Sequence, residues 1–331
     1  MASFIYRTHI SQEWYLNFAD ASARVKPSPY LVYKFGQRIG DPKMEAFGAS
    51  LISASGPGRG DTLQRYLPKL FSDDTGEQST GAIPYESQVW LDQIEVMCAR
   101  ESQGTAEGFF LGAKGGHNAE SHNHNDIGTF IVYSDGQPLI VDAGVGTYTA
   151  QTFGATRYDL FTMRSSYHNV PTVNGCEQKE GEQYRSSRAI CTHSDRISSL
   201  TLDIAKAYPE KAGIVSWNRT VRMERPDIVF INDVYEVSEI RDRFYLHLLT
   251  PSVVSDDESG TLTLASRDLP DGLISGSAKV LYDADRFRAQ IEEVPLDDKR
   301  LAGVWGDALY RINLRATDPK PKDSWRLRVT R

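Results

Sequence analysis

Histidines gather in one short stretch of this chain. Residues 115–126 contain three of the seven histidines, namely His117, His122 and His124. A fourth, His168, follows within the next fifty residues. Imidazole is a neutral metal ligand and a proton carrier near neutral pH, so such clusters are typical of catalytic or metal sites. Residues i and i+2 of an extended strand face the same way, and we therefore expect His122 and His124 to enter one site side by side.

A carboxylate is placed where it could complete a metal site. Asp142 ends the apolar run 138–141 and precedes Ala143 and Gly144. Its burial would be costly without a cation or hydrogen-bond donors. Two histidines, one carboxylate and a water suit tetrahedral zinc. An isolated histidine is usually a surface or hydrogen-bonded core residue, but this combination favours a metal or catalytic site.

The remaining histidines have no such context. His193 is interpreted as a surface or hydrogen-bonded core residue, and His247, inside a strand pattern, as a packing residue. His9 is given no site role, and His117 is interpreted as a loop residue.

A second metal motif competes for the same residues. Gly116, five residues and then His122-x-His124 match the opening of the cupin metal motif. Cupins require a glutamate three or four residues further on, where this chain has Gly128 and Thr129. Asp126 is too close to substitute. A cupin-like metal enzyme acting on a small molecule therefore stays as the alternative hypothesis.

Composition excludes several other classes. The 331 residues carry a net charge of −7, which argues against non-specific nucleic-acid binding. The three cysteines are irregularly spaced and predict neither a disulfide framework nor a zinc knuckle. No apolar run approaches the roughly 20 residues that span a bilayer. The N-terminus lacks a signal peptide, which predicts a cytoplasmic protein as written, and a periplasmic or secreted one if the true N-terminus lies upstream.

The elements change type along the chain. Helical spacing is seen in residues 11–19, 30–36, 44–51 and 63–71, with a loop at 53–60. A polar segment with glycine and proline, 73–86, is the candidate linker. We predict a helical segment and linker over 1–85 and a second domain over 86–331.

The second part has the alternation and composition of strands. β-Branched and aromatic residues fill segments at 93–98, 129–133, 139–142, 228–231, 244–249, 261–264 and 325–329. Turn signals separate many of them, as at Asn174-Gly175. Many strands with few helices between them predict a mainly β fold of antiparallel sheets stacked as a sandwich.

The motifs, taken together, resemble the C-terminal β-sheet region of the heparinase II/III-like polysaccharide lyases. The matching segments are 115–130, 139–148 and His168-Asn169, followed by Asn174-Gly175 and Gln178. The flanking segments Asp20-Ala21, 33–40 and 207–219 are also similar, so the resemblance covers most of the chain. It implies the end of an α/α toroid followed by antiparallel sheets.

The resemblance implies lyase chemistry on a uronic-acid polysaccharide. A base removes the C5 proton of the uronate, its carboxylate is neutralised by hydrogen bonds, and an acid protonates the leaving glycosidic oxygen. His122 matches the family's cleft histidine. His124, Asp142 and His168 match the residues that hold one structural zinc ion.

Further cleft residues follow from position. Tyr158 lies where some members have a tyrosine facing the substrate, and we predict it as a second catalytic residue. Predicted substrate-binding residues near the motif are Asn118, Glu120, Asn123 and Arg157.

The sequence departs from the family pattern at its N-terminus. Most of the toroid, with the principal catalytic tyrosine and its histidine or asparagine partner, is missing. We therefore expect the C-terminal part of a longer lyase, whose missing toroid domain is its partner and which is weakly active or inactive alone. A non-catalytic carbohydrate-binding β-sandwich is the third hypothesis.

Overall fold

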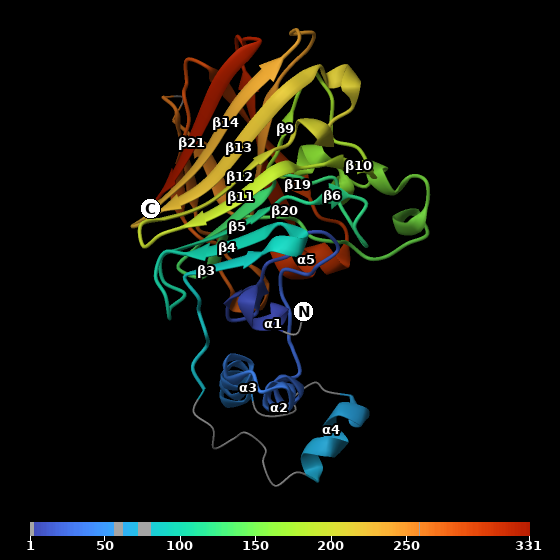
Figure 1. The fold of residues 1–331 in the computed structure, drawn as a ribbon, viewed down its shortest axis with the longest axis vertical. Helices are drawn as coiled ribbons and strands as arrows, with labels where there is room; N and C mark the ends of the chain where they lie inside the picture. Colours follow the sequence, from blue (N-terminus) through green and yellow to red (C-terminus); the bar gives the residue numbers. More distant parts are fainter. Residues whose placement is uncertain (1–2, 56–61, 72–80, 258) are drawn as a thin grey trace.

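Helices and sheets occupy opposite ends of the molecule. The computed structural model describes residues 3–55, 62–71, 81–257 and 259–331. Along the longest axis, α2 (Pro29–Ile39), α3 (Pro42–Ser55) and α4 (Leu63–Leu70) lie at one end and the sheets fill the rest (Figure 1). The short α1 (Phe4–Arg7) lies between them. Within the described residues, no helix has the length and apolar character needed to cross a membrane.

The helices predicted at 30–36, 44–51 and 63–71 are confirmed, but the helix predicted at 11–19 is wrong. The chain instead forms the antiparallel pair β1 (His9–Ser11) and β2 (Trp14–Tyr15), with Gln12 at φ 45° in the turn. Trp14 is fully buried, and its ring stacks on Trp305 at a centroid distance of 5.5 Å. Burying so large a ring against the sheets outweighs local helical spacing.

The two predicted irregular segments lie mostly outside the described residues. Of the loop at 53–60, residues 53–55 belong to α3 and the rest is not described. Of the linker at 73–86, only 81–86 are described, and they form no regular element. The first long strand begins at Gln88, and the division into 1–85 and 86–331 stays a prediction.

A five-stranded antiparallel sheet forms the centre of the molecule. Its order is β3 (Gln88–Leu91), β4 (Val96–Arg100), β5 (Phe109–Lys114), β7 (Phe130–Ser134) and β8 (Gln137–Ile140). Every residue of β4, β5 and β7 is buried, because both faces of the sheet are covered. Double burial explains the apolar runs seen in the sequence. A 3₁₀ turn at Asp92–Ile94 delays β4, so the strand predicted at 93–98 begins late.

Two further large sheets pack with it. The eight-stranded sheet runs β11 (Ser187–His193), β12 (Ile197–Asp203), β13 (Ile214–Glu224), β14 (Ile228–Val237), β21 (Lys322–Thr330), β18 (Ala278–Leu281), β17 (Thr261–Ala265) and β16 (Val253–Asp256). The four-stranded sheet runs β19 (Phe287–Pro295), β20 (Ala308–Ala316), β15 (Tyr245–Thr250) and β9 (Pro171–Thr172). The small pair β6 (His117–Asn118) and β10 (Gly181–Arg185) lies at one side (Figure 1).

One hydrophobic core joins the three large sheets. Leu111, Val221 and Leu314, one from each sheet, belong to the same buried cluster. A second cluster packs the opposite face of the five-stranded sheet against β1, β2 and α5 (Lys299–Trp305). The predicted mainly β fold of stacked antiparallel sheets is confirmed.

Candidate functional site

The two central histidines lie in a turn rather than in a strand. His122 and His124 belong to the connection between β6 and β7, and His122 has φ 60°. The backbone N–H of Asn123 donates to the carbonyl of Glu120 at 3.1 Å, which closes the turn. The expected extended geometry is therefore wrong here, because a left-handed residue breaks the alternation of a strand.

The two rings nevertheless converge on one carboxylate. Oδ2 of Asp20 lies 2.9 Å from Nδ1 of His122, and Oδ1 lies 3.0 Å from Nε2 of His124. Asp20 belongs to the segment between β2 and α2, and its backbone N–H donates to the carbonyl of His122 at 3.2 Å. The His122 side chain is 53% exposed, whereas that of His124 is 0% exposed. One ring therefore faces solvent and its neighbour faces the interior.

Asp20 is held as an anion. Burial opposes its ionisation, but hydrogen bonds from His124 and His122 and the charge of Arg157 keep the pKa of Asp20 well below its usual range. Nη2 of Arg157 lies 3.0 Å from Oδ1 of Asp20. An ionised carboxylate only accepts hydrogen bonds, so Nδ1 of His122 and Nε2 of His124 each carry the proton. In the neutral form of each ring, the other nitrogen, Nε2 of His122 or Nδ1 of His124, carries the lone pair.

The predicted metal ligands lie together. One ligand atom each from His124, Asp142 and His168 lies within 4.8 Å of the others, and all three residues are buried. Asp142 follows β8, and His168 follows a 3₁₀ turn at Ser165–Tyr167. Nδ1 of His168 lies 2.8 Å from Oδ2 of Asp142.

Two buried nitrogen atoms of this donor set lack hydrogen-bond partners. Nδ1 of His124 and Nε2 of His168 are buried and have no hydrogen-bond partner among the described residues. Burial lowers the pKa of His124, and the hydrogen bond to Asp20 offsets this only in part. A neutral imidazole with a buried lone pair is the form that ligates metal. The chemistry of two imidazoles and one carboxylate matches a zinc donor set.

The third ligand carries the negative charge of the set. Burial opposes the ionisation of Asp142, but the adjacent His168 ring outweighs it and keeps the pKa of Asp142 below its usual range. Burial would likewise lower the pKa of His168, but the Asp142 carboxylate raises it.

Side-chain amides that donate to backbone carbonyls fix the chain beside these residues. The side-chain amide of Asn17 donates to the carbonyl of Asp142 at 2.9 Å, so the N-terminal segment contacts the site here as well. Asn169 donates to the carbonyls of Phe130 and Val141 at 2.6 and 3.0 Å and fixes the chain next to His168. Asp126, the poor substitute for a cupin glutamate, instead pairs with buried Lys114 at 2.7 Å.

Three of the other predicted residues join the site. The Tyr158 hydroxyl donates to Oδ1 of Asn123 at 3.0 Å, and Arg157 donates to the carbonyl of Asn123 at 2.9 Å. Asn118 does not join them: it is 1% exposed and donates to Gln178 and to the carbonyl of Lys179. The Glu120 carboxylate is directed toward buried Lys114, at 3.5 Å. The substrate-binding roles of all these residues stay predictions.

Sequence reasoning missed two residues of the site. Asp20 was noted only as part of a similar flank, and Tyr148 only as the end of a matching segment. The Tyr148 hydroxyl donates to Oδ2 of Asp20 at 3.2 Å, and its ring lies beside that of His122 at a centroid distance of 6.3 Å. No periodicity links Asp20 to a loop more than a hundred residues later, so only a family pattern could have indicated it.

Solved structures share this fold. A heparan sulfate lyase HepC mutant from Pedobacter heparinus matches with a TM-score of 0.69 and 13% identity over 98% of this chain and 45% of that chain. A protein described as the heparinase III BT4657 gene product matches with a TM-score of 0.68 and 17% identity over 99% and 45%. A crystal structure of heparinase III gives 0.67 and 14% over 99% and 47%. At these identities the likeness concerns the fold.

The chain is much shorter than these proteins. This chain spans less than half of the length of those three proteins. A search of curated proteins gives no match. The family model described as heparinase II/III-like, C-terminal, matches residues 90–299, which is more than half of the chain. The chain therefore belongs to the heparinase II/III-like C-terminal family.

Proposed function

We propose that this chain is the C-terminal part of a polysaccharide lyase that cleaves a uronate-containing polysaccharide by β-elimination. The observation that carries the proposal is the shared carboxylate: Asp20 binds both the exposed His122 and the buried His124. One anion thus connects a solvent-facing proton carrier to a metal ligand. The match to the heparinase II/III-like family supports lyase chemistry.

His122 has the geometry of a proton-transfer residue. Its Nδ1–H is held by Asp20, so the neutral ring carries its lone pair on Nε2, and the side chain is 53% exposed. In the proposed reaction a proton leaves C5 of the uronate, the bond from C4 to the glycosidic oxygen breaks, a C4=C5 double bond forms, and the leaving oxygen is protonated. Nε2 of His122 either accepts the proton from C5 or, when protonated, donates to the uronate carboxylate.

The other residues of the site are proposed to bind the sugar. Tyr158 and Tyr148 place hydroxyl groups on either side of the histidine loop, through Asn123 and Asp20 respectively. Arg157 brings a positive charge to the same loop. Hydrogen-bond donors at this position would neutralise the substrate carboxylate as charge develops.

We propose that His124, Asp142 and His168 hold one structural zinc ion. Bound there, the ion would supply a fixed positive charge that crosslinks three loop segments. The protein's own part is to present two imidazoles and one carboxylate, with Asp20 orienting the ring of His124.

The test is an assay for unsaturated product. The protein encoded by the longest reading frame that contains this chain is incubated with heparan-type and alginate-type polymers. The ultraviolet absorbance of the C4=C5 product is followed. We expect product, and a loss of about 10²–10⁴-fold in rate for His122→Ala, the usual size of an acid–base contribution.

Two results would reject the lyase proposal. One is a folded protein that yields no unsaturated sugar from any uronate polymer. The other is product formed with His122→Ala at the wild-type rate. Glycan binding without product would favour the non-catalytic carbohydrate-binding hypothesis, which also predicts that His122→Ala leaves binding unchanged.

A further inference from the structure

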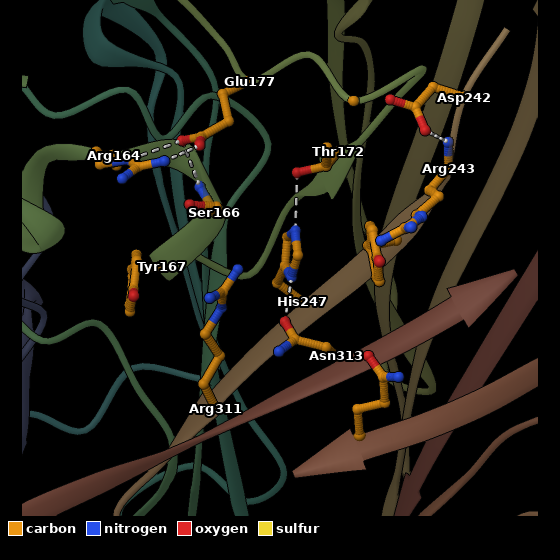
Figure 2. Close-up of a pocket in the computed structure, with 13 residues that line it drawn as sticks. Arg164, Ser166, Tyr167, Thr172, Glu177, Asp242, Arg243, His247, Arg311 and Asn313 are labelled. Atoms are coloured by element: carbon orange, nitrogen blue, oxygen red, sulfur yellow. Dashed lines mark hydrogen bonds and ion pairs between the residues drawn. The ribbon is translucent and has the colours of Figure 1, made fainter. Parts of the chain in front are cut away.

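A polar pocket opens on the outer face of the four-stranded sheet. Its volume is about 540 Å³, and none of its lining residues belongs to the site around Asp20 (Figure 2). We call it the arginine pocket and define it by six of its lining residues: Arg164, Tyr167, Arg243, Tyr245, Arg311 and Asn313. They come from the 3₁₀ turns before β9, from the start of β15 and from β20.

Strand alternation makes this face of the sheet polar. Ile312 and Leu314 of β20 point into the core, so Arg311, Asn313 and Arg315 point outward. Directly opposed residues on neighbouring strands share a face. Arg315 faces Arg288 on β19 and Tyr245 on β15, which places all three on the outward side.

The face is locally basic on an acidic chain. The pocket lining carries the three arginines Arg164, Arg243 and Arg311 against the two carboxylates of Glu177 and Asp242. The difference is +1, on a chain of net charge −7. Glu177 is paired with Arg164, and the Asp242 carboxylate accepts from the backbone N–H of Arg243 at 2.7 Å. The pocket therefore favours an anionic ligand.

A fixed hydrogen-bond chain forms the floor of the pocket. Nε2 of His247 lies 2.8 Å from the Thr172 hydroxyl, and Nδ1 lies 2.7 Å from Oδ1 of Asn313 (Figure 2). Burial lowers the pKa of His247 to about 3, so the ring is neutral. Because the amide oxygen of Asn313 only accepts, Nδ1 of His247 donates to it and Nε2 accepts from Thr172. The NH₂ group of Asn313 donates one N–H to Oε2 of Glu292 at 3.4 Å, and its second N–H is thereby positioned as a further donor.

Arg311 is held in place by a ring. Its guanidinium lies 4.3 Å from the centroid of Tyr167. Nη1 bonds to Glu292 at 3.1 Å, while the buried Nε has no hydrogen-bond partner among the described residues. A guanidinium stacked on a ring and held by a carboxylate is pre-organised to meet an oxyanion.

We propose that the arginine pocket binds a carboxylated or sulfated segment of an anionic oligosaccharide. Guanidinium groups match the planar oxygen pairs of such groups, and the Asn313 amide and the two tyrosines add sugar-hydroxyl and ring contacts. The choice of a sugar as ligand rests on the proposed function, whereas the preference for an anion rests on the pocket alone.

A second hollow connects the arginine pocket to the candidate site. It measures about 410 Å³, shares Arg164, Gly175 and Glu177 with the arginine pocket, and reaches Tyr158. Tyr158 bonds to Asn123 in the histidine loop. A polymer bound near His122 could therefore extend along this surface into the arginine pocket, which would hold the chain during cleavage.

The test is calorimetric titration of the full chain with a sulfated uronate hexasaccharide. The variant is Arg243→Gln with Arg311→Gln, and its matched control is Arg328→Gln, an exposed arginine of β21 in the eight-stranded sheet. We expect the double variant to weaken binding at least about tenfold, the size of one or two lost charge-assisted hydrogen bonds, and the control to change it less than about twofold. Exposed Arg243→Gln alone should weaken binding in the same direction if the double variant unfolds.

The outcomes separate this inference from the proposed function. Equal affinity of the double variant and the Arg328→Gln control for the hexasaccharide would overturn the proposed role of the pocket. Binding of neutral maltohexaose as tightly as the sulfated hexasaccharide would overturn it as well. Binding of inorganic sulfate as tightly as the hexasaccharide would reduce the pocket to a simple anion site and also overturn it. Loss of binding in His122→Ala but not in the double variant would place the ligand at the histidine site alone. A weakened double variant in a protein that forms no unsaturated product would support the pocket while the lyase proposal fails.

Discussion

The carboxylate of Asp20 lies 2.9 Å from Nδ1 of His122, although 102 positions separate the two residues in the chain. Its second oxygen lies 3.0 Å from His124. The segment before the helices therefore fixes both the exposed ring of His122 and the buried ring of His124.

Replacing Asp20 should weaken the metal site without removing a ligand. For Asp20→Asn we expect zinc affinity to fall about 10–100-fold, because the partner that orients His124 loses its charge. Competition with a chromophoric chelator measures this affinity. Asp318→Asn, which makes the same change at an exposed residue paired with Lys320, serves as the control. Unchanged zinc affinity in Asp20→Asn would show that the carboxylate does not orient the ligand.

The two neighbouring histidines should give opposite phenotypes. His124→Ala removes a buried donor, and we expect loss of the single bound zinc and of the stability that it adds, about 2.7 kcal/mol at a free zinc concentration of 100 times Kd. His122→Ala should retain one zinc per chain and the wild-type melting temperature, because its side chain is 53% exposed. Elemental analysis and thermal unfolding measure both. Equal zinc content in the two variants would contradict the division of roles.

Arg219 should be a major determinant of stability. Its fully buried guanidinium binds Asp233 through two bonds of 2.8 and 2.7 Å and also donates to the carbonyls of Gly128 and Asn169. It thus ties β13 to the loops beside the proposed metal ligands. Arg219→Met leaves the Asp233 charge buried and unpaired, so we expect a loss of about 3–5 kcal/mol in the free energy of unfolding.

Urea unfolding measures the effect of Arg219→Met. The exposed Arg326→Met on β21 is the matched control, with an expected change within about 0.5 kcal/mol. Similar losses in both variants would show that the buried pair has no special role.

Stability should fall with acidity through His247. Its pKa is lowered to about 3 by burial, whereas an unfolded chain titrates near the ordinary value of 6.5. Below pH 6.5 the unfolded state therefore binds one more proton, and the folded state loses up to about 1.4 kcal/mol per pH unit from this residue until pH 3. Above pH 6.5 the ring is neutral in both states, so His247 causes no further change in the free energy of unfolding.

Variants at His247 separate this contribution from those of other groups. His247→Gln should flatten the dependence of unfolding free energy on pH between 7 and 5 relative to wild type. His193→Gln, at an exposed histidine, should leave the slope as it is. An unchanged slope in His247→Gln would place the acid sensitivity elsewhere.

Local pattern in the sequence was sufficient for much of the fold. The apolar runs around 130–133 and 139–141 predicted strands because a sheet buried on both faces needs continuous apolar residues. Helical spacing predicted α2 and α3 in the same way. The pattern failed at 11–19, where Trp14 and its stacking partner Trp305 decide the conformation from nearly 300 positions away. Spacing within a window carries no information about such a contact.

The sequence by itself determined which residue types could form the site, namely His122, His124, Asp142 and His168, because imidazole and carboxylate side chains stand at loop and strand ends. Only the tertiary structure decided which of these side chains faces solvent and which are buried together. It buried His124 beside Asp142 and His168, turned His122 outward through a left-handed turn, and brought Asp20 between the two rings. The physical reason is that burial and hydrogen-bond partners, which set the charge and the free lone pair of each ring, depend on segments that meet only when the sheets stack.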